Sequence, residues 1–126
     1  MLVTRIMAGL MVPALLLSIG VQYNDPDGPL WMAIYAFPLA LAILALVKRV
    51  NVFAPLGAAA YGLAFAVWMP WGYLSHVPEY VSTVHMTSQE SEWAREAIGL
   101  LICAVWMVFP AVTWWRQRRA SAMASE

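Results

Sequence analysis

Residues 20–31 read GVQYNDPDGPLW and stand between two apolar runs, from Ile6 to Val21 and from Leu30 to Val47. A helix that crosses the hydrocarbon core of a bilayer needs about 20 mostly apolar residues. Asn, Asp, Pro and Gly are residues that tight turns favour, because they bond nearby backbone or accept unusual backbone angles. The stretch therefore predicts a turn between two membrane-spanning helices.

The overall composition agrees with a membrane protein. Hydrophobic residues make up 63% of the 126 residues and charged residues 11%, whereas soluble domains have about 45–50% and about 25%. The formal net charge is zero, so no basic surface for nucleic acid is expected. Cys103 is the one cysteine in the sequence, so an intrachain disulfide is impossible and we expect a small buried hydrophobe there.

Four apolar runs predict four spans, at about residues 6–22, 30–47, 52–74 and 96–115. Prolines fall inside all four runs, at Pro13, Pro38, Pro70 and Pro110. Membrane bundles tolerate such prolines because neighbouring helices can satisfy the freed carbonyls. The predicted fold is an all-α four-helix transmembrane bundle. It forms a single domain over residues 1–119, followed by a disordered cytoplasmic tail over 120–126. Gly57 and Gly62 predict a close packing face on the third span.

The basic residues predict an orientation. Six of the seven fall on one side of a four-span topology and only Arg95 falls on the other; the six are Arg5, Lys48, Arg49, Arg116, Arg118 and Arg119. Positively charged loops stay in the cytoplasm, so both termini are predicted to be cytoplasmic. All acids except Glu126 then lie outside. The prediction is a multi-pass integral membrane protein, in the plasma or inner membrane if the source is bacterial.

An alternative concerns the first 20 residues. Arg5, an apolar core and the small-x-small sequence Ser18-Ile19-Gly20 also fit a cleaved signal peptide. Cleavage would leave three spans, whereas the length of the run and Pro13 in its middle favour a retained first span. The mass of the purified protein distinguishes the two.

Polar residues gather at the outer ends of the spans. Ser88 is a good helix N-cap, and the helix that it starts is expected to continue into the fourth span. Glu92, Arg95, Glu96 and Gly99 follow at spacings of three and four, so they share one face. Ionisable groups at the head of an apolar run usually face the bundle interior or a watery pocket. These residues and the turn predict a polar cap that holds a ligand, with Asn24, Asp25, Asp27, Glu92, Arg95 and Glu96 as its candidate ligand-binding residues.

Each part of this cap also has a structural explanation. The Asn-Asp-Pro-Asp-Gly sequence is ordinary turn chemistry. Arg95 with Glu92 or Asp25 forms a salt bridge that locks two helices in this alternative. His76 and His85 are expected to be solvated, with a minority alternative as metal ligands beside Glu79 or Glu90. The sequence therefore leaves open whether a metal or other cofactor is bound, and it indicates no catalytic residue.

Two longer stretches, QYNDPDGPLWMAIY (22–35) and EWAREAIGLLI (92–102), resemble the transmembrane protein 220 family of small four-span membrane proteins. The resemblance covers nearly the whole chain in span number and length. It carries over ten positions, Asn24, Asp25, Pro26, Asp27, Trp31, Tyr35, Glu92, Arg95, Glu96 and Gly99. It implies the fold and the topology, and it implies no particular reaction. We expect a structural motif of Gln22, Tyr23, Pro26, Trp31, Tyr35 and Gly99.

Three functions are compatible with these features. The first is a membrane protein whose acidic cap binds a cation or a small polar ligand. The second is a structural or accessory subunit of a larger membrane complex, in which the cap only latches helices. A membrane hydrolase that uses Asp25, Asp27, Glu96 or His85 is less favoured, because no nucleophile–base pair or metal-ligand spacing is present. The expected partners are the lipid bilayer and, in the second case, other membrane subunits or further copies of this chain.

Overall fold

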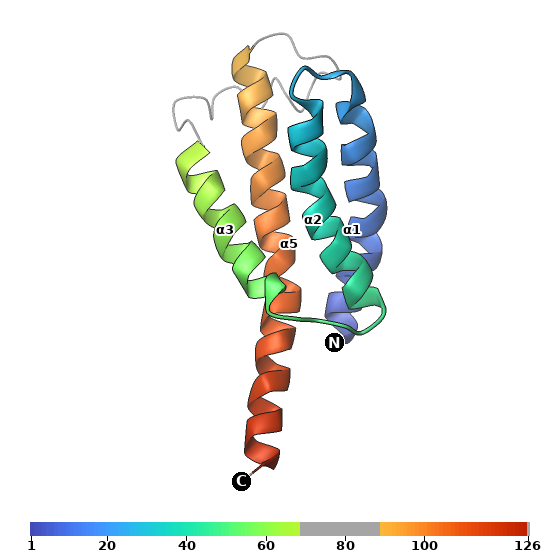
Figure 1. Ribbon diagram of the computed structural model, residues 1–126, viewed down its shortest axis with the longest axis vertical. Helices are drawn as coiled ribbons and strands as arrows, with labels where there is room; N and C mark the ends of the chain where they lie inside the picture. The colour runs from blue at the N-terminus through green and yellow to red at the C-terminus, as the bar shows by residue number, and fades with distance from the viewer. Residues whose placement is uncertain (69–88, 126) are drawn as a thin grey trace.

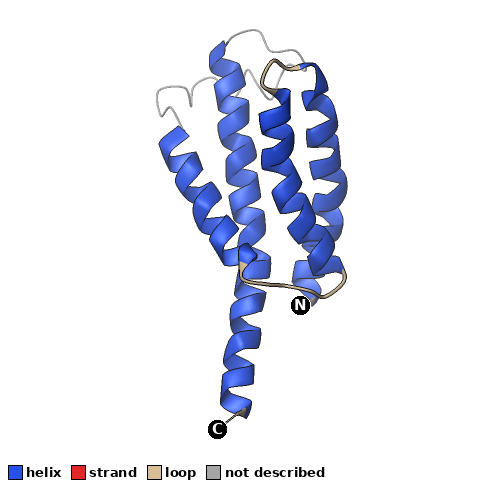
Figure 2. Cartoon of the chain, in the orientation of Figure 1, coloured by secondary structure: helices blue, strands red, loops and turns tan. Residues whose placement is uncertain are grey.

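A computed structural model describes residues 1–68 and 89–125. Within these residues the chain forms four α-helices and one 3₁₀ turn, and no strand (Figure 2). The elements are α1 (Leu2–Gly20), η1 (Val21–Asn24), α2 (Gly28–Leu46), α3 (Phe53–Trp68) and α5 (Gln89–Ala124). The predicted all-α class is confirmed.

The helices form a bundle in which α5 lies between α2 and α3 (Figure 1). Helix α1 packs mainly against α2, and α3 packs mainly against α5. Both termini lie at the same end of the bundle, where α5 projects beyond the other helices (Figure 1). We call the opposite end, with the α1–α2 turn and the first turns of α5, the cap end. The four-helix arrangement thus brings together the two polar segments that the sequence singled out.

Three of the helices are long and apolar enough to cross a membrane, and α3 is a shorter apolar helix. The predicted first span starts four residues late, because α1 already begins at Leu2. The second prediction agrees with α2 within two residues at its start and one at its end. For the third span, residues 69–74, including Pro70, lie outside the described part of the chain.

Helix α5 extends beyond the predicted fourth span in both directions, from Gln89 to Ala124. Residues 120–124, for which the sequence predicts a disordered tail, are therefore helical. Their composition accounts for this difference, because Ala, Arg, Gln and Met favour helices and recur in RQRRASAMA (116–124). Arg119 also lies over the Trp115 ring, with 3.5 Å between its guanidinium carbon and the ring centroid, and such pairs at a spacing of four support a helix.

The core is built from small and aromatic side chains on the facing sides of the helices. Its buried members are Ala8, Leu15, Trp31, Tyr35, Leu41, Ala42, Ala45, Ala54, Leu100, Cys103, Trp106 and Met107. The small residues let the helices approach closely. A Cβ atom on Gly57 would lie 2.7 Å from Met107 Sδ, whereas a Cβ on Gly62 would meet nothing within 4 Å. The close helix contact that the sequence predicted for the third span is therefore present at Gly57 and not at Gly62.

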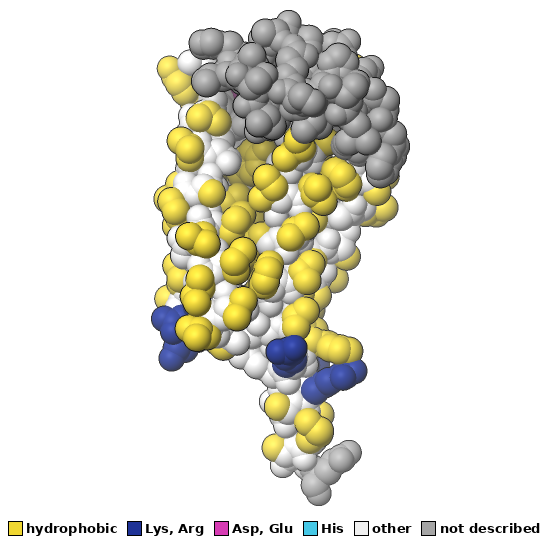
Figure 3. All heavy atoms as spheres, turned by 180° about the vertical axis from the view of Figure 1, so that it is seen from behind, with side chains coloured by type: hydrophobic (Ala, Val, Ile, Leu, Met, Phe, Trp, Pro, Cys, Tyr) yellow, Lys and Arg dark blue, Asp and Glu magenta, His cyan; other side chains and the backbone are white. Residues whose placement is uncertain are grey.

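The outer wall of the bundle is apolar. Hydrophobic side chains cover the helices, and Lys and Arg side chains gather at the terminal end below them (Figure 3). This wall includes Leu10, Leu17, Ile43 and Leu63, all of which are exposed. A soluble protein rarely exposes such a large continuous apolar surface. The surface therefore suits a bilayer as its solvent.

Helix α2 ends in a tight backbone motif beside the basic residues. Lys48 adopts a left-handed φ of 61°. Its N–H donates to the Ala45 carbonyl at 3.1 Å, and the Arg49 N–H donates to the Leu44 carbonyl at 2.8 Å. These two bonds make a Schellman motif, which satisfies carbonyls that the end of a helix leaves open. The motif turns the chain into the loop that leads to α3.

A proline in α2 creates a partner for α3. Pro38 has no N–H, so the Ile34 carbonyl one turn earlier loses its usual helical donor. The Tyr61 hydroxyl of α3 donates to that Ile34 carbonyl. This bond lies in the apolar part of the bundle, where an unsatisfied carbonyl is costly. It thus links α2 to α3 in a region where these two helices otherwise touch little.

Removing this bond is expected to destabilise the bundle modestly. Tyr61→Phe should lower the unfolding free energy by about 0.6–1.5 kcal/mol, the range for interhelical and buried hydrogen bonds. Pro38→Ala restores a backbone donor to Ile34, so Tyr61→Phe should cost less in that background. Thermal unfolding of the four proteins in detergent measures the coupling. Equal costs in both backgrounds would show that the hydroxyl does not compensate for the proline.

Candidate functional site

The cap begins with a tightly folded turn between α1 and α2. The chain leaves η1 through Asp25, whose backbone is extended (φ −80°, ψ 144°), as expected for a residue that precedes proline. The Asp25 N–H donates to the Gln22 carbonyl at 3.1 Å, and the Gly28 N–H donates to the Asp25 carbonyl at 3.0 Å. A Cβ atom on Gly28 would collide with the Gln22 carbonyl oxygen. Glycine is therefore required at position 28, and the turn is held in one conformation.

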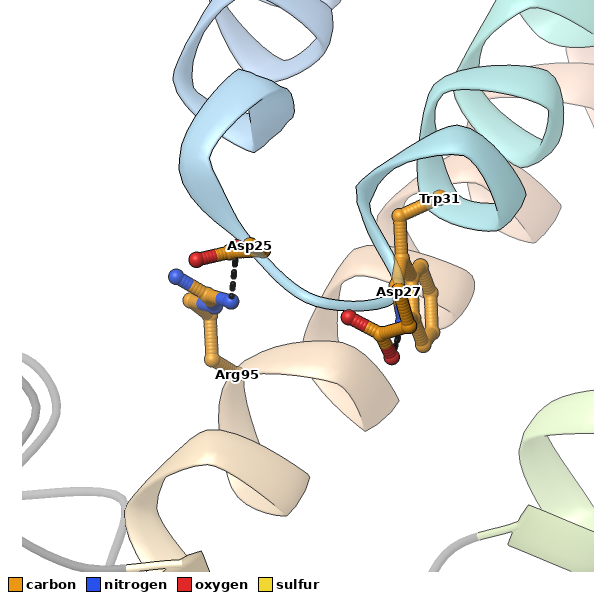
Figure 4. Close-up of polar contacts among 4 residues, drawn as sticks. All are labelled: Asp25, Asp27, Trp31 and Arg95. Carbon is orange, nitrogen blue, oxygen red and sulfur yellow. Dashed lines mark hydrogen bonds and ion pairs between the residues drawn. The ribbon is translucent and has the colours of Figure 1, made fainter.

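This turn directs Asp25 toward α5. The Arg95 Nη2 donates to Asp25 Oδ2 at 3.3 Å, and the two side chains are 22% and 21% exposed (Figure 4). The pair joins residues 70 positions apart in the sequence. One of the two salt bridges proposed for Arg95 is thus formed. Partly exposed pairs of this kind contribute about 0–1 kcal/mol, so the pair positions the turn more than it stabilises the fold.

Asp27 points to the other side of the turn (Figure 4). The indole Nε1 of Trp31 donates to Asp27 Oδ2 at 3.0 Å. Asp27 is also the N-cap residue of α2, but its side chain makes no capping bond. Its backbone carbonyl accepts instead from the N–H groups of Leu30 and Trp31, at 3.0 and 3.3 Å. The carboxylate of Asp27 is therefore oriented by the Trp31 indole and makes no hydrogen bond to the N–H groups at the start of α2.

Three carboxylates converge beside this aspartate. One oxygen from each of Asp27, Glu92 and Glu96 can be chosen so that all three lie within 4.8 Å of one another. Glu92 and Glu96 are one helical turn apart on α5, so they present their carboxylates on the same face. Asp27 lies in the turn, directly before the first residue of α2, and its carboxylate approaches the two glutamates. We call these three residues the carboxylate cluster.

The burial of the cluster is graded. Asp27 is exposed, Glu92 is half-buried and Glu96 is only 5% exposed. Like charges this close repel one another, and the repulsion grows as the surroundings become less polar. Arg95, the residue before Glu96 in the sequence, pairs with Asp25. A cation at the cluster would offset the repulsion and would tie α2 to α5.

Gly99 lies one turn deeper on α5 and faces α2. A Cβ atom there would collide with the Tyr35 hydroxyl oxygen and would lie 3.2 Å from the Tyr35 Cζ. The sequence placed Gly99 in the structural motif and on the same face as Glu92 and Glu96. In the structure, Tyr35 of α2 is the neighbour at this position. The approach is possible because glycine leaves room for the aromatic ring.

The sequence model of transmembrane family 220, helix, matches residues 14–112. The chain belongs to transmembrane family 220. No curated protein and no solved structure matches the chain. The matched residues of this family 220 protein include both halves of the cap, the turn at Asp25–Asp27 and the head of α5. Membership in the family confirms the predicted resemblance and an apolar helical membrane protein.

The structure divides the six predicted ligand-binding residues into groups. Asp25 and Arg95 pair with each other, while Asp27, Glu92 and Glu96 form the carboxylate cluster. Asn24 is exposed at the end of η1. Ser88, Glu79 and both histidines lie outside the described residues, as does the side chain of Glu90. The metal-ligand alternative for the histidines stays a prediction.

The predicted structural motif is spread around the cap. Trp31 and Tyr35 are buried with a ring-centroid distance of 6.0 Å, and Gln22 is 4% exposed. The Gln22 Oε1 atom has no hydrogen-bond partner within the described part of the chain. Tyr23, in contrast, is 75% exposed, which is typical of an aromatic anchor at a membrane interface. The motif therefore combines packing residues with one surface residue.

Sequence reasoning missed two polar contacts that shape this end of the bundle. Trp31 was expected as part of the structural motif, but it also orients Asp27. The sequence contained a signal for this contact, because residues 27 and 31 are four positions apart at the start of a predicted helix and can therefore lie on the same face. Tyr61 was not singled out, although Pro38 predicts an open Ile34 carbonyl in α2. The choice of Tyr61 as donor depends on how α3 packs, which the sequence does not determine.

Proposed function

We propose that this family 220 protein binds a divalent cation at the cap end through Asp27, Glu92 and Glu96. The observation that supports the proposal is the convergence of three carboxylates within 4.8 Å, from the turn before α2 and from α5, which are far apart in the sequence. Carboxylate oxygens are the ligands of hard cations such as Ca²⁺, Mg²⁺ and Mn²⁺.

The spacing is compatible with Ca²⁺, which we take as the first ion to test. Oxygen ligands bind Ca²⁺ at about 2.3–2.6 Å, so oxygens on opposite sides of the ion are about 4.6–5.2 Å apart. The three oxygens of the carboxylate cluster lie within 4.8 Å of one another. Mg²⁺ binds at about 2.0–2.1 Å and demands a stricter octahedral geometry, whereas Ca²⁺ accepts more varied arrangements of oxygens.

A bound cation would act as a clamp between helices. Asp27 precedes α2, and the two glutamates belong to the first turns of α5. An ion shared by all three would hold α2 and α5 together at the end where Asp25 and Arg95 already connect them. Binding would therefore stabilise the folded bundle in proportion to the logarithm of the free ion concentration.

The experiment is thermal unfolding of the purified chain in detergent while Ca²⁺ is titrated. A ligand at 100 times its Kd stabilises the folded state by about 2.7 kcal/mol. Asp27→Asn should abolish the rise in Tm. Asp25→Asn is the matched control, because it changes the same turn by the same chemistry but leaves the carboxylate cluster intact. A wild-type Tm that does not move with Ca²⁺, Mg²⁺ or Mn²⁺ would contradict the proposal.

A second candidate function is a structural one, in which the cap only latches helices within a larger membrane complex. The Asp25–Arg95 pair supports it, since this pair connects the turn to α5 without any ligand. In that case Asp25→Asn and Asp27→Asn should lower the Tm by similar amounts with or without Ca²⁺. Co-purification in mild detergent would then show a stable partner, and a lone monomer in every detergent would argue against this candidate.

We further propose that the cap faces the extracytoplasmic side. Six of the seven basic residues belong to the terminal end of the bundle, as the positive-inside rule requires for a cytoplasmic location. Tyr23 is exposed at the cap and Ser121 is exposed near the C-terminus. A membrane-impermeant maleimide should label Tyr23→Cys in intact cells and Ser121→Cys only after permeabilisation. The opposite pattern would reverse the proposed orientation.

A further inference from the structure

A cavity of about 500 Å³ lies next to the cap, between α2, α3 and α5. Its lining residues are Asp27, Leu30, Trp31, Ile34, Ala60, Tyr61, Ala64, Val67 and Leu100. The size falls within the range of about 300–1,000 Å³ that is common for small-molecule sites. Among the residues that the structure describes, Asp27 is the charged one in this lining. The cavity is thus an apolar slot with a carboxylate at one end.

The two ends of the slot differ in chemistry. Its deep end is bounded by Tyr61 and Ile34, which are joined by the hydrogen bond from the Tyr61 hydroxyl to the Ile34 carbonyl. Its cap end carries Asp27 with the Trp31 indole beside it. From Asp27 to Ile34 the chain advances seven residues, or about 10 Å at the helical rise of about 1.5 Å per residue. A molecule in the slot therefore has an apolar environment along its length and a negative charge at one end.

The sides of the slot border the apolar wall of the bundle. Leu30 of α2 is 59% exposed and Val67 of α3 is 78% exposed. In a bilayer these side chains face lipid, so an apolar molecule can reach the slot from the membrane. A purely polar solute would lose its hydration against this lining without gaining hydrogen bonds. The occupant that fits is therefore amphiphilic.

We propose that this slot binds an amphiphile with a cationic amine head group, which places an alkyl chain along the slot and the ammonium group at Asp27. The charge of Asp27 selects a cationic head over a neutral or anionic one. Trp31 lines the slot beside Asp27, and its indole N–H orients the carboxylate by donating to Oδ2. Binding of an amphiphile needs no metal ion, so this proposal goes beyond the proposed function. The slot and the carboxylate cluster have only Asp27 in common.

The test compares three probes with the same chain, dodecylamine, dodecanol and dodecanoate, added to the full chain in dodecyl maltoside. Binding is measured by the rise in Tm and by native mass spectrometry. Dodecylamine should bind best, and Asp27→Asn should weaken it roughly tenfold, to the affinity of dodecanol. Ala60→Phe, at an exposed position on the rim of the slot, should reduce binding of dodecylamine and of dodecanol. Ala64→Phe serves as a second variant that fills the slot if Ala60→Phe does not fold.

Equal binding of all three probes to the wild type would overturn the inference, because it would show partition of the chain without head-group selection. Unchanged dodecylamine binding in a folded slot-filling variant would also overturn it. If the Tm of the chain rises with Ca²⁺ but not with dodecylamine, the amphiphile proposal is wrong and the proposed cation function stands. If the chain binds dodecylamine selectively and its Tm does not respond to divalent cations, the cation function is wrong and the amphiphile proposal stands.

Discussion

Glu96→Gln is expected to abolish stabilisation by Ca²⁺ in a chain that still folds. The substitution keeps the size of this buried side chain and removes one of three neighbouring negative charges. With the ion, one charged ligand is missing, so the binding free energy falls. Thermal unfolding with and without Ca²⁺ separates this loss from any change in the stability of the ion-free protein.

Comparing the Ca²⁺ response of several variants separates a cation-binding role of a residue from a structural role. Glu92→Gln should behave in the same way as Glu96→Gln, because both residues belong to the carboxylate cluster. Asp25→Asn should retain the full response to Ca²⁺, since Asp25 is paired with Arg95. If Glu96→Gln instead lowers the Tm equally in the presence and absence of Ca²⁺, Glu96 supports the fold and the cation proposal fails at this residue.

Gly99→Ala is expected to destabilise the bundle clearly, because it overpacks the contact between α5 and α2. Its new Cβ would collide with the Tyr35 hydroxyl, and overpacking of this kind costs about 1–3 kcal/mol. Gly62→Ala is the matched control. Its Cβ would meet nothing within 4 Å, so it should be neutral or stabilise the helix by about 0.5–1 kcal/mol. Unfolding in detergent gives both values.

A second substitution tests whether the Tyr35 hydroxyl is the cause. Tyr35→Phe removes the oxygen that the new Cβ would strike and leaves Tyr35 Cζ as the nearest atom, at 3.2 Å. The cost of Gly99→Ala should therefore be smaller in the Tyr35→Phe background. An equal cost in both backgrounds would mean that position 99 is sensitive for a reason other than this contact.

Much of the fold could be predicted from the sequence, because the bilayer restricts the choices. Long apolar runs in lipid must be helices, and a polar turn between two of them must lie at the membrane surface. The same reasoning placed Asp25 and Arg95 at one end of the bundle, where they form an ion pair. Span lengths were less certain, since the first and last helices extend beyond their apolar cores.

The detailed geometry of the cap could not be predicted in this way. Asp25 and Asp27 are two residues apart in similar surroundings, yet one contacts Arg95 and the other approaches the glutamates of α5. The extended backbone at Asp25 and the proline that follows it separate their directions. The slot likewise depends on how far α3 stands from α2. Periodicity and composition carry no information about that distance.

The most direct test of the cation proposal is to count bound Mn²⁺ by electron paramagnetic resonance as the ion is titrated into the detergent-solubilised chain. Mn²⁺ also prefers carboxylate oxygens, and Ca²⁺ added afterwards should displace it. The wild type and Asp25→Asn should bind Mn²⁺ with the same affinity, whereas Asp27→Asn and Glu96→Gln should bind it much more weakly. Identical titration curves for the wild type and Glu96→Gln, or no binding by the wild type, would contradict a cation site at the carboxylate cluster.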